Sequence, residues 1–360
     1  MRVLLGRLAG IASLCVAMFG LAVLSPARAA GPGGTPSGTI VLMGYSGPVK
    51  DNYTAAVIRP FMEKYPNVKV IYDAAGSSAQ MLGMLRAQKA HPQVDVDIMD
   101  FSVSRVANKE GLFSPLDPAI VTNLSDLYEP ARTPGNMGPG IDFDNLVLIY
   151  NTQAMKTPPV GIKDLVDPAN RGKITFPPAP NVIGIALELV VAKYLGVDYK
   201  GSQDPEIAVL KKIARNVSTW SPMPDAYTMV INGDADLGVG WNARAQTYIG
   251  KSGGKLGAVT MKAGSILDID TINLVAHSRN PEAAQLFINF ALSPGAQERY
   301  AKLMFYGPTN QDAKLPPDIL ARTSSYPPTL KKMIPVDWNY VASVQDKWTE
   351  RWRREVVPTH

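Results

Sequence analysis

The feature that most constrains the fold is an alternation of short apolar runs with longer segments of helical periodicity. Apolar runs occur at 39–43, 68–72 and 94–101, and helical patterns begin near Asp51, a possible helix cap, and near Gly76. Parallel strands need long crossover connections, which are usually helices. Strands that alternate with helices therefore predict an α/β fold with a largely parallel sheet.

The turns that follow these runs predict where a ligand binds. In an α/β sheet the ligand crevice lies beyond the carboxyl ends of the strands. Tyr45 and Ser46 follow the first run, Ser77 follows the second, and Ser102 follows the third. We therefore expect these four residues to lie on one rim of a binding site.

A second α/β series begins near Asn145 and predicts a second lobe. About 330 residues remain after removal of an N-terminal signal, which is enough for two lobes. Asn181 is the expected cap of a long apolar helix. The expected strands span 146–151, 172–176 and 236–242, and the expected helices span 182–195, 204–215, 227–233, 281–292, 295–303 and 338–353, the last of them packed on the outside.

The stretch 264–275 is expected to return the chain to the first lobe as a strand, because β-branched residues favour a pleated backbone. Side chains alternate between the faces of a strand, so Asp268, Asp270 and Ile272 share one face. Buried charges need partners. Either the two carboxylates lie at a solvated strand end, or at least one of them lines a cleft and binds a cationic ligand.

Residues 1–29 have the pattern of a secretory signal peptide. Two arginines precede an uncharged apolar run at 8–24, and 27–29 reads Ala-Arg-Ala, an A-x-A cleavage pattern; an uncleaved anchor is the alternative. Residues 30–37, rich in Gly and Pro, are expected to form a flexible spacer. The single cysteine, Cys15, lies inside the apolar run, so the processed chain would contain no cysteine.

Charge and motif content argue against several classes of function. The formal net charge of +5 becomes +2 when three arginines leave with the signal peptide (5 − 3 = 2), and no Lys/Arg cluster marks a nucleic-acid face. His91, His277 and His360 are too scattered for a metal site or a catalytic triad. No nucleophile elbow or phosphate loop is present. We therefore expect no nucleic-acid partner, metal, cofactor or enzymatic activity.

Five segments in a fixed order carry a family resemblance. They are 145–151, the DLVDPANRGKI segment at 164–174, the GDADLGVGWN segment at 233–242, and the segments 283–294 and 306–310. In this order they resemble periplasmic solute-binding proteins of ABC importers, specifically the polyamine (spermidine/putrescine)-binding type. The resemblance covers nearly the whole processed chain.

The resemblance implies a periplasmic-binding-protein-like fold of type II, with two α/β lobes, a hinge and a cleft between the lobes. The implied lobes are 38–144 with 270–315, and 145–269 with 316–360. The implied role is to capture a small solute by lobe closure and to deliver it to an inner-membrane ABC permease. A periplasmic monomer without cofactor or catalysis is expected.

The resemblance also assigns roles to individual residues. Trp241 matches the family's stacking tryptophan, whose indole face attracts an alkylammonium; the alternative is a core tryptophan at a strand end. Asp270 matches the aspartate that holds the amine, and Tyr306 matches a cleft tyrosine. Asp268 stands where the family usually has a second tryptophan, which is a departure.

Two further departures bear on the solute. The rim loop at Tyr45 and Ser46 lacks the tryptophan and glutamate of a spermidine binder, and 181–184 lacks the family's acidic pair. A short polyamine, a monoamine or a zwitterion therefore fits better than a long polycation. The acid of a zwitterion, or an anionic solute such as a phosphonate or organic acid, could bind at Ser77-Ser78, where a helix begins, and Arg244 could pair with the anionic solute. The candidate ligand-binding set is Tyr45, Ser46, Ser77, Ser102, Asn181, Tyr227, Trp241, Asn242, Asp268, Asp270 and Tyr306.

Overall fold

The computed structural model describes residues 37–359. The predicted signal peptide, the spacer up to residue 36, Cys15 and His360 lie outside the described residues. Within 37–359, no helix is long and apolar enough to cross a membrane.

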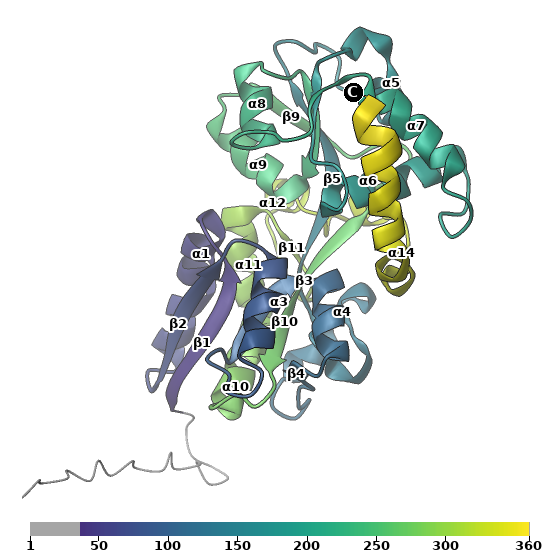
Figure 1. Ribbon diagram of the computed structural model, residues 1–360. Helices are drawn as coiled ribbons and strands as arrows, with labels where there is room; N and C mark the ends of the chain where they lie inside the picture. Colours follow the sequence, from purple (N-terminus) through teal and green to yellow (C-terminus); the bar gives the residue numbers. More distant parts are fainter. Residues whose placement is uncertain (1–36, 360) are drawn as a thin grey trace, which may run out of the picture. The chain divides into compact units, whose positions relative to one another are not determined.

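The first lobe is built on a sheet in the order β2-β1-β3-β10-β5, with parallel pairing among the first three strands and antiparallel pairing of β10 to both of its neighbours (Figure 1). Apolar side chains on the two faces of this sheet form separate cores. One core contains residues of α1, α2, α10 and α11, and the other contains residues of α3 and α4. The bounds are β1 (Gly38–Tyr45), β2 (Val68–Ala75), β3 (Val96–Asp100), β4 (Phe113–Ser114), β5 (Gly140–Asn151), β10 (Leu267–Val275), β11 (Gly307–Pro308), α1 (Pro48–Tyr53), α2 (Arg59–Lys64), α3 (Ser78–Ala87), α4 (Phe101–Lys109), α10 (Pro281–Ala291) and α11 (Pro294–Met304).

The second lobe is built on the strand order β5-β8-β6-β7, in which β8, β6 and β7 are parallel and β5 runs antiparallel to β8. Helix α6 is apolar nearly all round and buried, which is typical of a central core helix. The bounds are β6 (Ile174–Thr175), β7 (Val217–Thr219), β8 (Leu237–Trp241), β9 (Leu256–Val259), α5 (Ile162–Val166), α6 (Val182–Leu195), α7 (Asp204–Ala214), α8 (Ala226–Asn232), α9 (Asn242–Lys251), α12 (Pro317–Leu320), α13 (Pro327–Leu330) and α14 (Trp338–Arg351).

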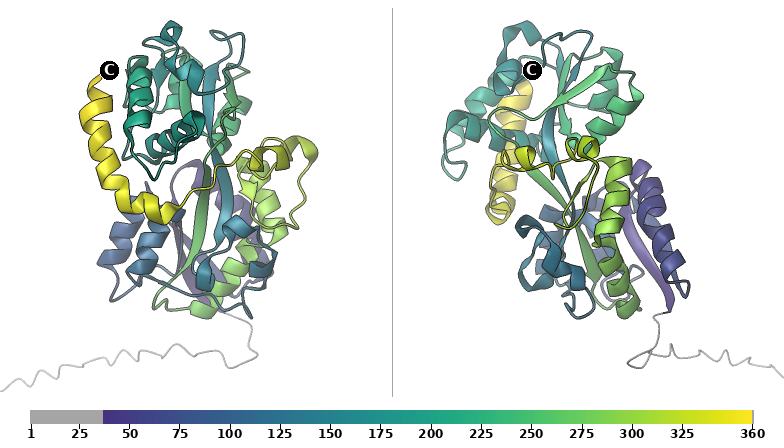
Figure 2. Two further views of the ribbon diagram at one scale, coloured as in Figure 1. Left: turned by 90° about the vertical axis from the view of Figure 1, so that its right-hand side faces the viewer. Right: turned by 180° about the vertical axis from the view of Figure 1, so that it is seen from behind.

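Two strands pass from one lobe to the other. On β5, Phe143 packs in the core of the first lobe and Leu146 in the core of the second. On β10 and the residues before it, Ile266 belongs to the second core and Ile269 to the first. Figures 1 and 2 show these strands connecting the two groups of helices. The exact lobe limits, 38–144 with 270–315 and 145–269 with 316–360, stay a prediction.

The start of the first helix and the position of Ser102 differ from the predictions. Helix α1 begins at Pro48, with Gly47 at its cap, so Asp51 lies inside the first turn instead of capping it. Proline is favoured at the first helical position because its missing N–H would be unsatisfied there. Ser102 lies in the first turn of α4 rather than in a loop, because Asp100 caps this helix by accepting a hydrogen bond from Ser102 N (2.8 Å).

The C-terminal helix α14 packs on the outside of the second lobe as predicted, and its inward face buries Val341 and Trp348 (Figure 2). Trp348 and Trp352 are 2% and 0% exposed and belong to the core of the second lobe. The indole Nε1 of Trp352 donates to Oε2 of the buried Glu188 (2.7 Å), and Gln203 Nε2 donates to Oε1 of the same carboxylate (2.6 Å). The other end of α14 contacts α4 of the first lobe. Thus the C-terminal segment touches both lobes (Figure 2).

Candidate ligand-binding site

Strand register brings five aspartates to one face of the sheet where the strands cross. Asp270 on β10 lies opposite Asp100 on β3 and opposite Asp142 on β5. Asp268 lies opposite Asp144 on β5. Directly paired residues of antiparallel strands point to the same face, so all five carboxylates lie together. We call Asp100, Asp142, Asp144, Asp268 and Asp270 the aspartate cluster.

The carboxyl ends of β1, β2 and β3 converge on this cluster. Tyr45 Oη, at the end of β1, donates to Asp270 Oδ1 (2.9 Å). The same hydroxyl lies 2.7 Å from Oγ of Ser78, which follows β2. Ser78 Oγ in turn accepts a hydrogen bond from the backbone N–H of Asp100 (3.1 Å). Hydrogen bonds therefore connect the end of β1, the start of α3 and the end of β3, and Tyr45 is the predicted rim residue that takes part in them.

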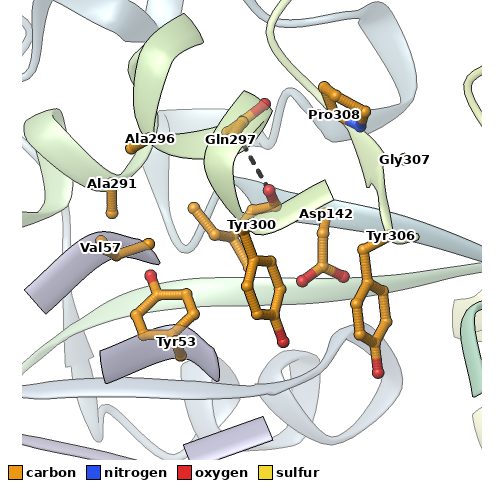
Figure 3. Close-up of a pocket in the computed structure, with 11 residues that line it drawn as sticks. Tyr53, Val57, Asp142, Ala291, Ala296, Gln297, Tyr300, Tyr306, Gly307 and Pro308 are labelled. Atoms are coloured by element: carbon orange, nitrogen blue, oxygen red, sulfur yellow. Dashed lines mark hydrogen bonds between the residues drawn. The ribbon is translucent and has the colours of Figure 1, made fainter. Parts of the chain in front are cut away.

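Tyrosines surround Asp142 of the cluster (Figure 3). The rings of Tyr300 and Tyr306 stack at 5.5 Å, and Tyr53 meets Tyr300 edge-on at 5.2 Å. These residues line a small cavity of about 10 Å³. Asp142 is only 6% exposed, and neither its Oδ1 nor the hydroxyl of Tyr53 has a hydrogen-bond partner among the described residues. Buried polar atoms are usually satisfied, so Oδ1 of Asp142 is an exception.

The electrostatics of the cluster follow from burial and mutual repulsion. Burial, with the nearby charge of Asp100, raises the pKa of Asp270 to about 7, although the hydrogen bond from Tyr45 opposes this. Burial also raises the pKa of Asp144 to about 7 and that of Asp142 and Asp268 well above the ordinary value. None of the ion pairs between described residues includes a cluster carboxylate. The cluster is therefore short of positive charge.

The second lobe contributes a concave wall around a cavity of about 720 Å³ at the carboxyl ends of β6, β7 and β8. The turn after β6, the turn after β7 and the first turn of α9 line it; Asn181, Tyr227 and Arg244 are among its residues. Asn181 caps α6 as predicted, because its Oδ1 accepts a hydrogen bond from Ile183 N (2.9 Å). No group of three or more His, Cys, Asp or Glu side chains in residues 37–359 is arranged to hold a metal ion.

Trp241 ends β8, and buried Tyr227 fixes its backbone. Trp241 N donates to Tyr227 Oη (2.6 Å), and this hydroxyl donates to Trp241 O (3.1 Å). The Tyr227 ring stacks on Tyr248 at 5.2 Å, which holds the hydroxyl in place. The indole of Trp241 stays partly exposed. Trp241 pairs with Leu146 on β5. The two residues before Leu146 are Asn145 and Asp144, and Asp144 belongs to the aspartate cluster.

Asp144 connects the cluster to the second lobe. Its Oδ1 and Oδ2 accept hydrogen bonds from Ala243 N, at the start of α9, at 2.9 and 3.2 Å. A carboxylate is favourable at this position because the helix N-terminus carries partial positive charge. Arg244 follows immediately and its side chain is exposed. The negative and positive parts of the site therefore meet where β5 contacts α9.

The remaining predicted residues divide into two groups. Ser46 and Ser77 are exposed, and Ser77 caps α3 by accepting a hydrogen bond from Gln80 N (3.2 Å). Asn242 is 8% exposed, and its Nδ2 donates to the carbonyl of Arg322 (2.8 Å). Asn242 thus binds the C-terminal segment with its amide, whereas Ser46 and Ser77 lie on the open rim. Their contact with a ligand stays a prediction.

Sequence reasoning did not identify Asp100, Asp142 and Asp144. A signal was present, because Asp142 and Asp144 alternate with apolar residues in the same i, i+2 pattern as Asp268 and Asp270. What the pattern did not give was the pairing register, which decides whether the two strands present their acids to the same face.

Comparison with known proteins identifies the family. Residues 56–328 match the model of the family described as bacterial extracellular solute-binding protein. The chain belongs to this family. The solute-binding protein is 26% identical over 295 residues to the spermidine/putrescine-binding periplasmic protein of Escherichia coli (strain K12). The aligned region covers 77% of this chain and 82% of that protein. This chain is 23% identical over 307 residues to the thiamine-binding periplasmic protein of the same strain, with 83% and 88% covered.

A solved structure confirms the predicted fold class. An ABC transporter structure from Clostridium perfringens ATCC 13124 matches with a TM-score of 0.73 and 26% identity, covering 88% of this chain and 99% of that one. The predicted family resemblance is confirmed as well. The solute-binding protein is a component of an ABC transporter, with two α/β lobes.

Proposed function

We propose that this protein captures a small amine-containing solute in the periplasm and delivers it to an inner-membrane ABC permease. The observation that carries the proposal is the aspartate cluster, five carboxylates on one face, none of which forms an ion pair among residues 37–359. Burying a carboxylate without a counter-charge is costly, whereas a hydrogen-bonded cation offsets much of that cost. An ammonium group supplies both the charge and the N–H donors that the cluster lacks.

Individual residues have defined parts in this proposal. Asp270, already oriented by Tyr45 Oη, accepts charge-assisted hydrogen bonds from the ammonium. The unpartnered Oδ1 of Asp142 is a second acceptor in the cluster. The partly exposed indole of Trp241 attracts the cation, which contributes roughly 0.5–2 kcal/mol. Asp100, Asp142 and Asp144 offset the absence of acidic residues at the rim loop and at 181–184.

The relatives and the local charge both support an amine over an anion. Two relatives are named for spermidine/putrescine and thiamine binding. The anion site considered at Ser77-Ser78 is less favourable, because Ser78 Oγ contacts Tyr45 Oη and the backbone of Asp100. An anion there would face the aspartate cluster, and like charges repel.

The remaining parts of the proposal concern how the protein works. We propose that the signal peptide is cleaved, that the mature chain acts as a monomer, and that it performs no chemistry on its solute. Lobe closure is then stabilised only by what the solute binds better in the closed state. The permease recognises the protein with its lobes closed.

The experiment that tests the proposal is a thermal-shift screen of the mature protein against amines and, separately, against organic acids and phosphonates. A ligand at a hundredfold excess over Kd stabilises the fold by about 2.7 kcal/mol. We expect stabilisation by at least one amine, lost in Asp270→Asn and retained in Asp234→Asn, whose carboxylate is exposed before the amino end of β8. Stabilisation by acids alone would refute the amine proposal.

A further inference from the structure

We infer that the solute is a zwitterion of the amino-acid type, whose ammonium binds the aspartate cluster and whose carboxylate binds Arg244. The inference rests on the proposed function and narrows its solute class. It is carried by a second charged element, Arg244, which lines the cavity of the second lobe and directly follows Ala243, the residue that contacts Asp144 of the cluster.

Arg244 has the properties of a ligand-binding cation. Its side chain is exposed and lines the cavity of about 720 Å³ together with Tyr227 and Asn181. No hydrogen bond or ion pair of its guanidinium is present among the described residues. By contrast, Arg86 pairs with Glu110, and Arg351 pairs with Asp204 and Glu355.

The acidic groups nearest to Arg244 in the chain and in the cavity have partners of their own. Asp144 uses both oxygens on Ala243 N. Asp225 accepts from Thr228 N with Oδ1 (2.8 Å) and from Tyr248 Oη with Oδ2 (2.7 Å). The guanidinium is therefore free to bind an incoming carboxylate, whose two oxygens match its planar fork of donors.

The proximity of the two charged elements discriminates between solute classes. Asp144 of the cluster bonds to Ala243, the residue before Arg244. A diamine that filled the cluster with one ammonium would bring its second one toward the guanidinium, and a dicarboxylate would bring an acid toward five aspartates; both arrangements are repulsive. A molecule with one charge of each sign satisfies both elements at once.

The test is calorimetric titration of the mature protein with ω-amino acids of two to six carbons, and with the alkylamine and diamine of each length. We expect at least one amino acid to bind tenfold or more tightly than both amines of its length. In Arg244→Met this advantage should disappear, because amino-acid affinity falls tenfold or more while alkylamine affinity changes less than threefold. Arg171→Met removes an exposed arginine that precedes β6, at the amino end of the strands, and should behave as wild type.

Retained alkylamine binding shows that Arg244→Met is folded, so a loss of amino-acid binding alone reports on the carboxylate. Equal affinity for amino acids and alkylamines, a preference for diamines, or an amino-acid advantage that survives in Arg244→Met would overturn the zwitterion inference and leave the proposed function standing. Binding of neither amines nor amino acids would overturn both.

Discussion

Replacing Asp270 with Asn should stabilise the empty protein relative to wild type, and this gain in unfolding free energy should be larger at pH 8 than at pH 5. The pKa of Asp270 is raised to about 7 in the folded state, first by burial and then by Asp100. A raised carboxyl pKa means that the folded state binds more protons than the unfolded state. The stability contribution of this group is therefore complete below about pH 4 and is lost as pH rises through about 7. The amide of Asn does not ionise, so the variant escapes this loss.

The size of the effect follows from the shift. The difference between 3.8 and about 7 is roughly three pKa units, which corresponds to an upper bound on the order of 4 kcal/mol at pH 8. The charge of Asp270 also raises the pKa of Asp142 and Asp268, so its removal acts with the same sign on them. Because Asn keeps a carbonyl oxygen, it can still accept the hydrogen bond from Tyr45 Oη.

Urea unfolding of both proteins at pH 5 and pH 8, without added solute, measures this effect. We expect the difference in unfolding free energy between variant and wild type to favour the variant by about 1–4 kcal/mol more at pH 8 than at pH 5. Asp234→Asn, at an exposed site, should show no pH-dependent difference. A difference that does not change with pH, or one that favours wild type more at pH 8 than at pH 5, would refute the inference that the buried charge of Asp270 destabilises the empty protein.

Two further predictions concern the site and the core. Amine affinity should fall as pH drops from 8 to 5. Burial raises the pKa of Asp270 and of Asp144 to about 7, so both carboxyls must release protons before they pair with an ammonium. Calorimetry in buffers of different ionisation enthalpy should detect this proton release, and an amine affinity that does not change with pH would contradict it. Replacing Trp352 with Phe removes the indole N–H that binds buried Glu188 Oε2, and should lower the urea-unfolding free energy by about 1–3 kcal/mol; an unchanged midpoint would count against that contact.

Local sequence patterns carried much of the fold. The alternation of apolar runs and helical patterns depends on neighbouring residues, and it placed Tyr45, Ser77 and the end of β3 correctly at one edge of the sheet. Capping by Asn181 was also a local property. These features could be predicted because turns, caps and periodicity are determined within a few residues.

The features that were not predicted depend on contacts between distant segments. The meeting of Asp142 with Asp270 requires the antiparallel register of β5 and β10, which are more than a hundred residues apart in the chain. The burial of Trp352 requires a buried acceptor, Glu188, on α6 of the second lobe. Arg244 could not be separated from an ordinary surface arginine until the cavity around it was described.

The aspartate cluster lies on the strands that cross between the lobes, whereas the opposing wall is made of turns at 177–181 and 220–225 and the start of α9. Protein engineering can treat these two halves separately. Random libraries confined to the wall would leave the crossing strands and their charge intact, so under the proposed function each selected variant should still bind an ammonium group while the rest of the bound molecule changes. The chain thus offers a starting point for fluorescent sensors of different amino compounds from one hinge.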